Sequence, residues 1–374
     1  MHSIHALLEV AMQGKASDLV LKAGAPPIFR VDGRMHVSDL PPLSVTETRE
    51  LAYEILFSAG RDTLLLEEDK EISLNDSPDD LMEELYRLRE LDLVFTIPGI
   101  ARVRANLFLQ RGCVGAALRI IPLYPLTVEE LGLPPILKRI ALEPQGLIII
   151  TGPTGSGKTT TMAALIEEIN RSKCAHVFTI EDPVEYVFSD RKSVIHQREI
   201  GRDTASFQAA LRSVMRQTPD VIAIGELRDA ETMEVAMVAA EIGHLVITTL
   251  HTTSAATTID RIVNSFPQHL KQQTCQQLAS SLLCVTSQRL VRRARGGGRV
   301  PAVEIMTNSP RVRKALEEGD TTSLYACIRE GSHFGMNTMN QALERMVHSQ
   351  IISVEEALQT TSNPTELKQM LRQQ

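Results

Sequence analysis

The stretch from residue 147 to residue 160 constrains the fold most, because it joins a short apolar run to a glycine-rich loop and then to a helical pattern. The loop fits the pattern G-x-x-x-x-G-K-[ST] at Gly152, Gly157, Lys158 and Thr159. In that pattern, backbone N–H groups cradle nucleotide phosphates, the lysine reaches the β/γ oxygens and the hydroxyl reaches Mg²⁺. The helix that follows would point its N-terminal amides at the same phosphates. We therefore expect a nucleotide site here.

The whole loop is expected to contact the nucleotide, since its backbone must approach the phosphates closely. The nucleotide-binding residues predicted from this stretch are Gly152, Pro153, Thr154, Gly155, Ser156, Gly157, Lys158, Thr159 and Thr160.

Composition limits the class of protein. The chain has 374 residues, 43% hydrophobic content and a net charge of -7, so it gives no general attraction to phosphate backbones or anionic lipids, and we do not expect nucleic acid as a partner. No apolar run approaches the roughly 18 residues of a membrane span, so no direct membrane insertion is expected. The N-terminus lacks a signal-peptide pattern, which favours a cytoplasmic location. Five scattered cysteines without a C-x-x-C pair indicate reduced thiols.

Residues 1–121 show an α+β pattern. Ser44-Val-Thr-Glu47 and Ser77-Pro-Asp-Asp80 predict helix starts, and Asp32-Gly33 predicts a tight hairpin between strands. Three further strands are expected near residues 92–97, 102–110 and 114–121. Prolines 122, 125, 134 and 135 then predict a linker over residues 122–135, followed by a second domain over 136–374.

Apolar runs at residues 147–150, 177–180, 221–224 and 245–250 alternate with helical patterns, such as that over 231–242. This alternation is typical of a mostly parallel sheet covered on both faces, and so of an α/β domain. Residues 267–290 are expected to be helical, with a basic turn following at Gly296-Gly-Gly298. Helices are also expected in several pieces over residues 310–374.

Polar residues follow each predicted strand at the edge where ligands of such sheets bind. Glu226 directly follows the third strand and is the natural partner of Mg²⁺ or of the attacking water. After the second strand come Glu181, Asp182 and Glu185, among which spacing does not choose. His244 and His251 bracket the fourth strand, and either could contact the γ-phosphate.

Several motifs together resemble one family, the type IV pilus retraction ATPases (PilT-like) of the secretion and pilus motor superfamily. The resemblance is carried by residues 152–159 (Walker A), 179–186 with 197–204 (Asp box), 219–229 (Walker B) and 243–256 (His box). Ala16-Ser-Asp-Leu19 and Arg102-Val-Arg-Ala-Asn106 also resemble the PAS-like N-terminal domain of that family. The resemblance therefore implies a PAS-like α+β domain followed by a RecA-like P-loop ATPase domain with a helical C-terminal part.

The resemblance also implies residue roles. Lys158 would be the phosphate lysine, Thr159 the Mg²⁺ hydroxyl, Glu226 the Walker B carboxylate and metal partner, and Glu185 the general base. His244 and His251 would join the catalytic set. Arginines among Arg102, Arg104 and Arg119 would reach a nucleotide across a domain or subunit boundary.

Members of the family are hexameric rings, so the resemblance implies a homohexamer that uses ATP and Mg²⁺ to withdraw pilin subunits. Its partners would be an inner-membrane pilus platform protein (PilC-like) and another pilus ATPase, placing it peripherally at the membrane through the pilus base. Alternatives are an accessory PilU-like retraction subunit and a pilus-extension or type II secretion ATPase. The stretch 74–91 is longer than the usual connection in the family.

Overall fold

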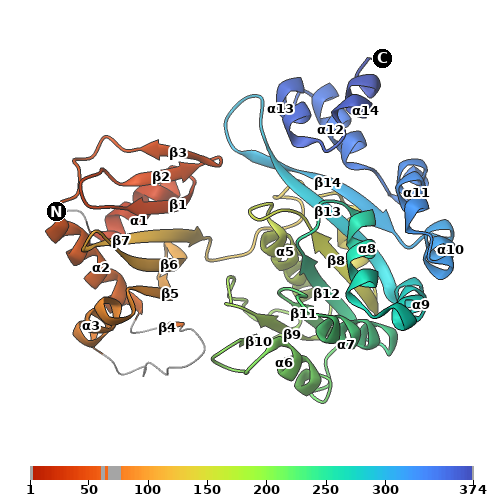
Figure 1. Ribbon diagram of the computed structural model, residues 1–374, viewed down its shortest axis with the longest axis horizontal. Helices are drawn as coiled ribbons and strands as arrows, with labels where there is room; N and C mark the ends of the chain where they lie inside the picture. Colours follow the sequence, from red (N-terminus) through yellow and green to blue (C-terminus); the bar gives the residue numbers. More distant parts are fainter. Residues whose placement is uncertain (1–2, 60–63, 66–76, 373–374) are drawn as a thin grey trace. The chain divides into compact units, whose positions relative to one another are not determined.

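The computed structural model describes residues 3–59, 64–65 and 77–372, and it forms two compact units. One unit is built from the residues up to Tyr124 together with Glu185–Val187, and the other from Pro125–Val184 and from Phe188 onward (Figure 1). Val128 and Leu133 lie within the stretch expected to be a linker, and both are buried in a core of the second unit. Residues 66–76, which include the start of the long connection at 74–91, lie outside the described residues.

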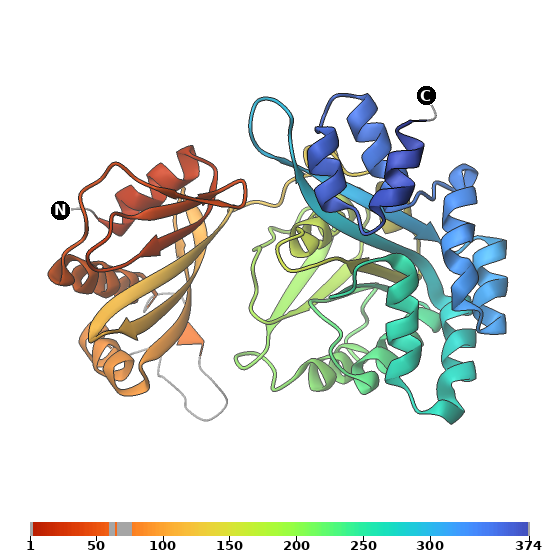
Figure 2. The same cartoon turned by 45° about the horizontal axis from the view of Figure 1, so that its top comes forward.

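The first unit contains a seven-stranded antiparallel sheet in the order β3-β2-β1-β7-β6-β5-β4. Burial alternates along its longer strands, so one face packs against three helices while the other lacks that cover (Figure 2). The elements are α1 Ile4–Gln13, β1 Ala16–Leu21, β2 Ile28–Val31, β3 Arg34–Val37, α2 Val45–Ala59, β4 Leu64–Leu65, α3 Pro78–Leu88, β5 Glu90–Ile97, β6 Ala101–Gln110 and β7 Cys113–Ile121.

Local sequence signals of the first unit are confirmed. The Glu47 carboxylate accepts a hydrogen bond from the Ser44 N–H at 2.8 Å, while the Ser44 hydroxyl accepts one from the Glu47 N–H at 3.1 Å. Ser77 and Asp80 make the same reciprocal pair at the start of α3. Asp32 and Gly33 form the tight turn between β2 and β3. These caps satisfy the helix N–H groups that have no intrahelical partner.

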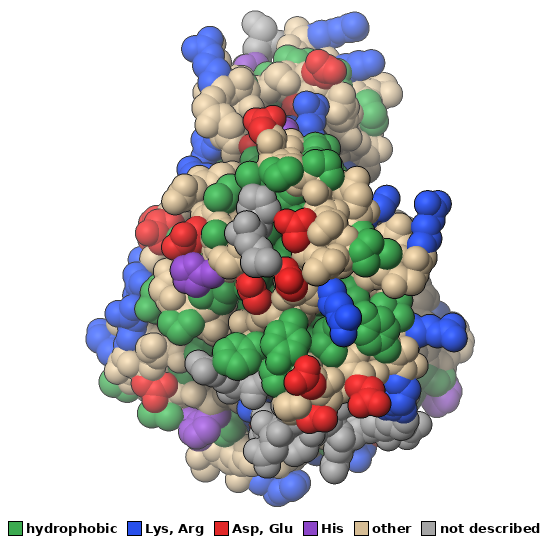
Figure 3. Space-filling model, turned by 90° about the vertical axis from the view of Figure 1, so that its left-hand side faces the viewer, with side chains coloured by type: hydrophobic (Ala, Val, Ile, Leu, Met, Phe, Trp, Pro, Cys, Tyr) green, Lys and Arg blue, Asp and Glu red, His purple; other side chains and the backbone are tan. Residues whose placement is uncertain are grey.

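Helices α2 and α3 also leave large side chains exposed, namely Tyr53, Phe57 and Tyr86. Figure 3 views this side of the molecule, where hydrophobic side chains gather between charged ones. Scattered exposed apolar groups of this kind are normal on a protein surface.

The second unit is built on a seven-stranded sheet in the order β10-β9-β11-β12-β8-β13-β14. All neighbouring strands are parallel except β14, which runs antiparallel to β13. The strands are β8 Gly146–Thr151, β9 His176–Glu181, β10 Val194–Glu199, β11 Val221–Ile224, β12 Leu245–Leu250, β13 Leu282–Arg292 and β14 Arg299–Thr307. The predicted parallel sheet is therefore confirmed.

Helices cover both faces of this sheet. Leu147 and Ile149 of β8 point into one core, while Ile148 and Ile150 point into the other, which explains the continuous apolar run. The helices are α4 Ile136–Ala141, α5 Lys158–Ser172, α6 Phe207–Val214, α7 Ala230–Glu241, α8 Ala255–Ser265, α9 Lys271–Ser281, α10 Pro310–Glu318, α11 Leu324–Glu330, α12 Met339–His348, α13 Val354–Thr360 and α14 Pro364–Met370.

The helix expected over residues 267–290 is wrong in its second half. Helix α9 ends at Ser281, and β13 then runs beside β8 as a buried strand and turns through Gly296-Gly-Gly298 into β14. Leu278, Leu282 and Leu283 are spaced like a helix face, but the chain changes element between them. Strand β10 was also missed, because this edge strand carries polar residues in place of an apolar run.

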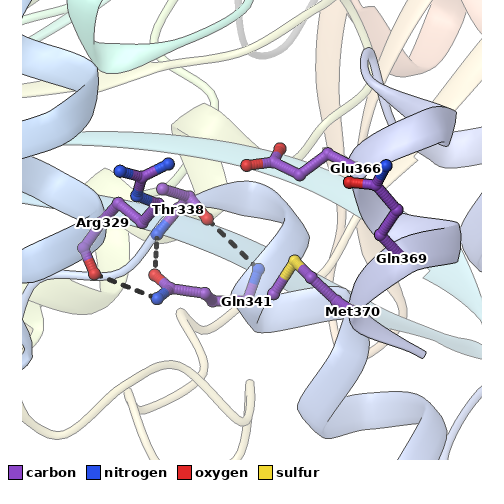
Figure 4. A pocket seen from close by; sticks show the side chains of 6 residues that line it. All are labelled: Arg329, Thr338, Gln341, Glu366, Gln369 and Met370. Atoms are coloured by element: carbon purple, nitrogen blue, oxygen red, sulfur yellow. Dashed lines mark hydrogen bonds between the residues drawn. The ribbon is translucent and has the colours of Figure 1, made fainter. Parts of the chain in front are cut away.

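The C-terminal helices α12, α13 and α14 pack on the β13–β14 hairpin around Val291 and Ala302 (Figure 1). Side chains of α11, α12 and α14 and the α12 cap residue Thr338 line a cavity of about 220 Å³. These lining residues are drawn in Figure 4. Within the described ranges, no helix is both long and apolar enough to cross a membrane.

Candidate nucleotide-binding site

The loop between β8 and α5 has the shape of an anion cradle. Gly152 has φ 144°, and a Cβ there would lie 2.4 Å from the Gln288 carbonyl oxygen and 2.6 Å from Ser156 Oγ, so only glycine fits. Helix α5 begins after Gly157, and no side chain caps its N-terminus. Its first N–H groups and the positive end of its dipole are therefore available to a phosphate.

Lys158 is buried at the mouth of this loop. Its ammonium donates to the carbonyl oxygens of Gly152 at 3.0 Å and Pro153 at 3.2 Å, so the side chain folds back over the loop. The ammonium also lies 3.3 Å from Nδ1 of His251. Because an ammonium can only donate, this ring nitrogen accepts, and the hydrogen of neutral His251 is on Nε2.

A chain of polar contacts leads from Lys158 across the strand ends. His251 Nε2 lies 3.5 Å from one Glu226 oxygen, and Arg228 Nε donates to the other at 3.1 Å. Arg228 also lies 3.7 Å from Asp182. The structure therefore brings together Lys158, His251 and Glu226, three residues expected to be catalytic, at the carboxyl edge of the parallel sheet.

The three carboxylates after β9 differ in their surroundings. Glu181 is buried, and it accepts hydrogen bonds from Thr179 at 2.7 Å and Gln197 at 3.3 Å. Asp182 is more exposed and faces Arg228. Glu185 is half-buried in the loop that follows the strand. The bond from Gln197 joins Glu181 on β9 to the neighbouring strand β10.

His244 lies at the amino end of strand β12, whereas Lys158, His251 and Glu226 meet at the carboxyl ends of the strands. It precedes β12, and its Nδ1 donates to the Pro219 carbonyl oxygen at 2.8 Å, just before β11. His251 follows β12, so the two rings are separated by the strand, about 20 Å at 3.3 Å per residue. Within one chain, the expected contact of His244 with a γ-phosphate is therefore not supported.

Gln288 of β13 forms hydrogen bonds that hold the phosphate loop, and the sequence did not predict this role. Its Nε2 donates to the Ser156 carbonyl oxygen at 2.6 Å, and its Oε1 accepts from the Thr161 hydroxyl at 2.9 Å. It is 1% exposed, so both bonds are shielded from water. No sequence motif marked it, because β13 was not predicted.

Buried hydroxyl groups link the phosphate loop to the His251 loop. The Thr151 hydroxyl, one residue before Gly152, accepts from the Thr252 N–H at 3.0 Å and donates toward the Thr252 carbonyl oxygen at 2.9 Å. Thr252 Oγ1 lies 2.7 Å from the Thr258 hydroxyl on α8. The two loops are thus held to one another.

Arg104 and Arg119 belong to the first unit, where they are cross-strand partners on β6 and β7. Arg119 lies 3.4 Å from Asp18, which also pairs with Arg30 at 3.3 Å. Arg102 donates to Thr96 at 3.2 Å. These side chains are on the face of the antiparallel sheet that the three helices do not cover.

The residues present fit a nucleoside triphosphate with a divalent cation. A cradle closed to any side chain at Gly152, an uncapped α5 and the Lys158 ammonium suit phosphate oxygens. Thr159, half-buried in the first turn of α5, and the Glu226 carboxylate would supply the oxygen ligands that Mg²⁺ prefers.

This fold and loop define an α/β protein of the P-loop nucleotide-binding class. Residues 116–374 match the family described as Type II/IV secretion system protein, and the chain belongs to that family. It is 43% identical to the type IV pilus retractation ATPase PilT of Pseudomonas aeruginosa over 96% of this chain and 98% of the relative. It is 39% identical to a twitching motility protein of Neisseria gonorrhoeae over 97% of this chain and 91% of the relative.

A solved structure described as the pilus retraction motor PilT with bound ADP is also similar. It has a TM-score of 0.80 and 39% sequence identity, and the match covers 99% of this chain and 100% of that one. The resemblance found in the sequence motifs and the fold class expected from it are both confirmed.

Proposed function

We propose that this protein is an ATP-hydrolysing motor that powers retraction of a type IV pilus and so supports twitching motility. The observation that carries the proposal is its 43% identity, over nearly the whole length of both chains, to a pilus retraction ATPase. The contacts among Lys158, His251 and Glu226 support hydrolysis at the same site.

In this proposal the loop from Gly152 to Thr160 binds the phosphates, and Lys158 turns from its own loop carbonyls to the β/γ oxygens. Thr159 and Glu226 would hold Mg²⁺, which would supply positive charge at the transferring phosphoryl group. Glu185 removes a proton from the attacking water, and the products are ADP and phosphate. His251 orients Glu226 through its Nε2–H.

The arginines of the first unit, Arg104 and Arg119, are proposed to contact a nucleotide bound by another subunit. Support comes from their adjacent positions on a sheet face that the helices do not cover. His244 is left out of the catalytic set of a single chain, because it lies at the other end of β12. We propose a homohexamer that acts on a membrane platform protein at the pilus base.

The biochemical test is ATP hydrolysis by purified protein with Lys158→Ala. Loss of the ammonium should lower turnover by at least about 100-fold, because no other cation is placed on the loop to stabilise the transferring phosphoryl group. Lys173→Ala, at the far end of α5, is the matched control and should hydrolyse ATP normally. Wild-type turnover by Lys158→Ala would contradict the site assignment.

The cellular test is deletion of the gene, followed by complementation with wild-type or Lys158→Ala protein. Excess surface pili without twitching, restored to normal only by the wild-type protein, is the expected result for a retraction motor. Loss of surface pili would instead indicate an extension motor. Normal piliation and movement after deletion would rule out both roles.

A further inference from the structure

Glu304, on β14, is a buried carboxylate to which the proposed chemistry assigns no role. It is 3% exposed and stands opposite Ser287 in the β13–β14 register. Its Oε1 accepts a hydrogen bond from the Ala255 N–H at 2.7 Å, and its Oε2 accepts one from the Met339 N–H at 3.1 Å. One side chain therefore joins two segments that are far apart in the sequence.

Both donors are the first residues of helices. Ala255 begins α8 after its cap Ser254, and Met339 begins α12 after its cap Thr338. The N–H groups of a first helical turn have no intrahelical partner and lie at the positive end of the helix dipole. A carboxylate between two such helix ends is stabilised, because it accepts hydrogen bonds from both and its negative charge faces both positive dipole ends. Burial raises the pKa of Glu304, while these two bonds and the charge of Arg289 oppose that shift.

Helix α8 is the direct continuation of the His251 loop. Thr252 is fixed to the strand end before the phosphate loop by the Thr151 hydroxyl, and the Thr253 carbonyl oxygen accepts from Ser287 at 3.2 Å. Three residues after Thr252, the Ala255 N–H meets Glu304. The loop that carries His251 is therefore held on one side by Thr151 and on the other by the β13–β14 hairpin.

Helix α12 approaches the same carboxylate from the C-terminal part. Its cap Thr338 and the side chain of Gln341 form a reciprocal pair, and both border the cavity of about 220 Å³ in Figure 4. Gln341 also donates to the Arg329 carbonyl oxygen at 3.1 Å. The start of α12 thus contacts Glu304 on one side and lines this cavity on another.

We propose that Glu304 is a positioning residue for ATP hydrolysis, holding the start of α8 so that His251 stays between Lys158 and Glu226, and tying that position to helix α12. The inference rests on the proposed function and deepens it. It makes the C-terminal helices a part of the molecule whose position affects turnover without touching the nucleotide.

The first test is Glu304→Gln, with kcat for ATP and the Kd for ADP measured separately. An amide keeps one acceptor oxygen but presents a donor to the second helix N–H, so one of the two bonds is lost. We expect kcat to fall about tenfold while the ADP Kd changes less than twofold, because Gln288 still holds the phosphate loop. Glu355→Gln, at an exposed position of α13, is the control and should keep wild-type values.

Unchanged kcat in folded Glu304→Gln would overturn the proposal. So would a fall in kcat that only matches a fall in the folded fraction measured by circular dichroism, since that indicates a purely structural carboxylate. An inactive wild-type protein would instead refute the proposed function, so the two failures can be told apart.

A second pair of variants decides the matter even where Glu304→Gln does not fold. Proline is tolerated at the first position of a helix, and Thr338 before it has extended φ and ψ of -75° and 164°. Met339→Pro removes the N–H that Glu304 accepts, whereas Met339→Ala removes the side chain only. We expect kcat of Met339→Pro to be about fivefold below that of Met339→Ala, with equal ADP Kd. Equal kcat values in the two variants would overturn the link to α12.

Discussion

The two ends of strand β12 carry the same residue type in contrasting surroundings. At the carboxyl end, His251 lies between the Lys158 ammonium and the Glu226 carboxylate and is partly exposed. At the amino end, His244 donates to the Pro219 carbonyl oxygen, and its own carbonyl oxygen accepts from the Gly146 N–H at 3.0 Å. In a parallel sheet all carboxyl ends share one edge, so only His251 can meet the side chains that follow the other strands.

The comparison teaches that position along a parallel strand, more than residue type, separates a reactive group from a structural one. At the carboxyl edge polar groups converge on a shared space, whereas at the amino edge they close off strand ends and turns. Asp220 shows this second use, since its carboxylate accepts a hydrogen bond at 2.8 Å from the N–H of His176, the first residue of β9. Four experiments test whether groups at the carboxyl ends of the strands affect nucleotide binding and hydrolysis while groups at the amino ends do not.

The largest effect is expected at the carboxyl edge from Glu226→Gln. Loss of the negative charge removes the proposed Mg²⁺ ligand, so kcat for ATP should fall by at least about 100-fold while ADP still binds. Stopped-flow phosphate release and a fluorescent ADP analogue measure the two quantities. Glu234→Gln, exposed on α7, should remain at the wild-type rate, and equal rates for the two variants would contradict a role for Glu226.

Gln288→Leu should have the next largest effect, on affinity. It leaves the Ser156 carbonyl oxygen and the Thr161 hydroxyl without their buried partner, which should weaken ADP binding about tenfold to 30-fold. Calorimetric titration with ADP measures the change. Gln276→Leu, at an exposed position of α9, supplies the comparison. An unaltered Kd in Gln288→Leu would mean that the loop keeps its shape without support from β13.

The two histidines give the most direct test. His251→Ala should lower kcat about tenfold, because Glu226 and Lys158 lose the ring between them. His244→Ala should keep kcat within about twofold but melt at a lower temperature, since it loses one hydrogen bond to Pro219. A fall in kcat for both variants, once corrected for folded protein, would show that the amino edge also contributes, for instance from a neighbouring subunit.

The smallest effect is expected from chemical labelling. Cys174 is exposed just before β9 at the amino edge, so a thiol reagent should attach there with kcat changed less than twofold. Burial raises the pKa of Cys284 in β13 to about 12, so at pH 8 it is almost entirely thiol and should react only after unfolding. Peptide mapping, with Cys174→Ser as the control, identifies the labelled residue.

Much of the second unit could be predicted from the sequence, because strands buried on both faces need unbroken apolar runs. Residues 147–150 and 245–250 are such runs. The glycine loop after the first run shows at which end of the parallel strands the ligand binds. Strand β13 could not be predicted in this way. It contains Thr286, Ser287 and Gln288, which are polar and buried, and the hydrogen-bond partners of Ser287 and Gln288 lie on other elements.

Site residues could be predicted where a reactive side chain follows a predicted strand within one sequence motif, as for Lys158 and Glu226. They could not be predicted where a contact depends on strand order, as for Gln288, which meets Ser156 132 residues away. The spacing of His244 and His251 also could not separate their roles, since each sits just outside the same apolar run. Only the contacts at the two strand ends separate them.

The crowding around Gly152 has a consequence for inheritance. Every missense change of a glycine codon adds a side chain, and at this position the first carbon of any side chain would meet the Gln288 carbonyl oxygen. Gly112, in the turn between β6 and β7, has φ 77° and nothing within 4 Å of an added Cβ, so it should accept asparagine or aspartate at low cost. In a twitching-motility selection on a library of all substitutions, codon 152 should therefore stay invariant while codon 112 drifts.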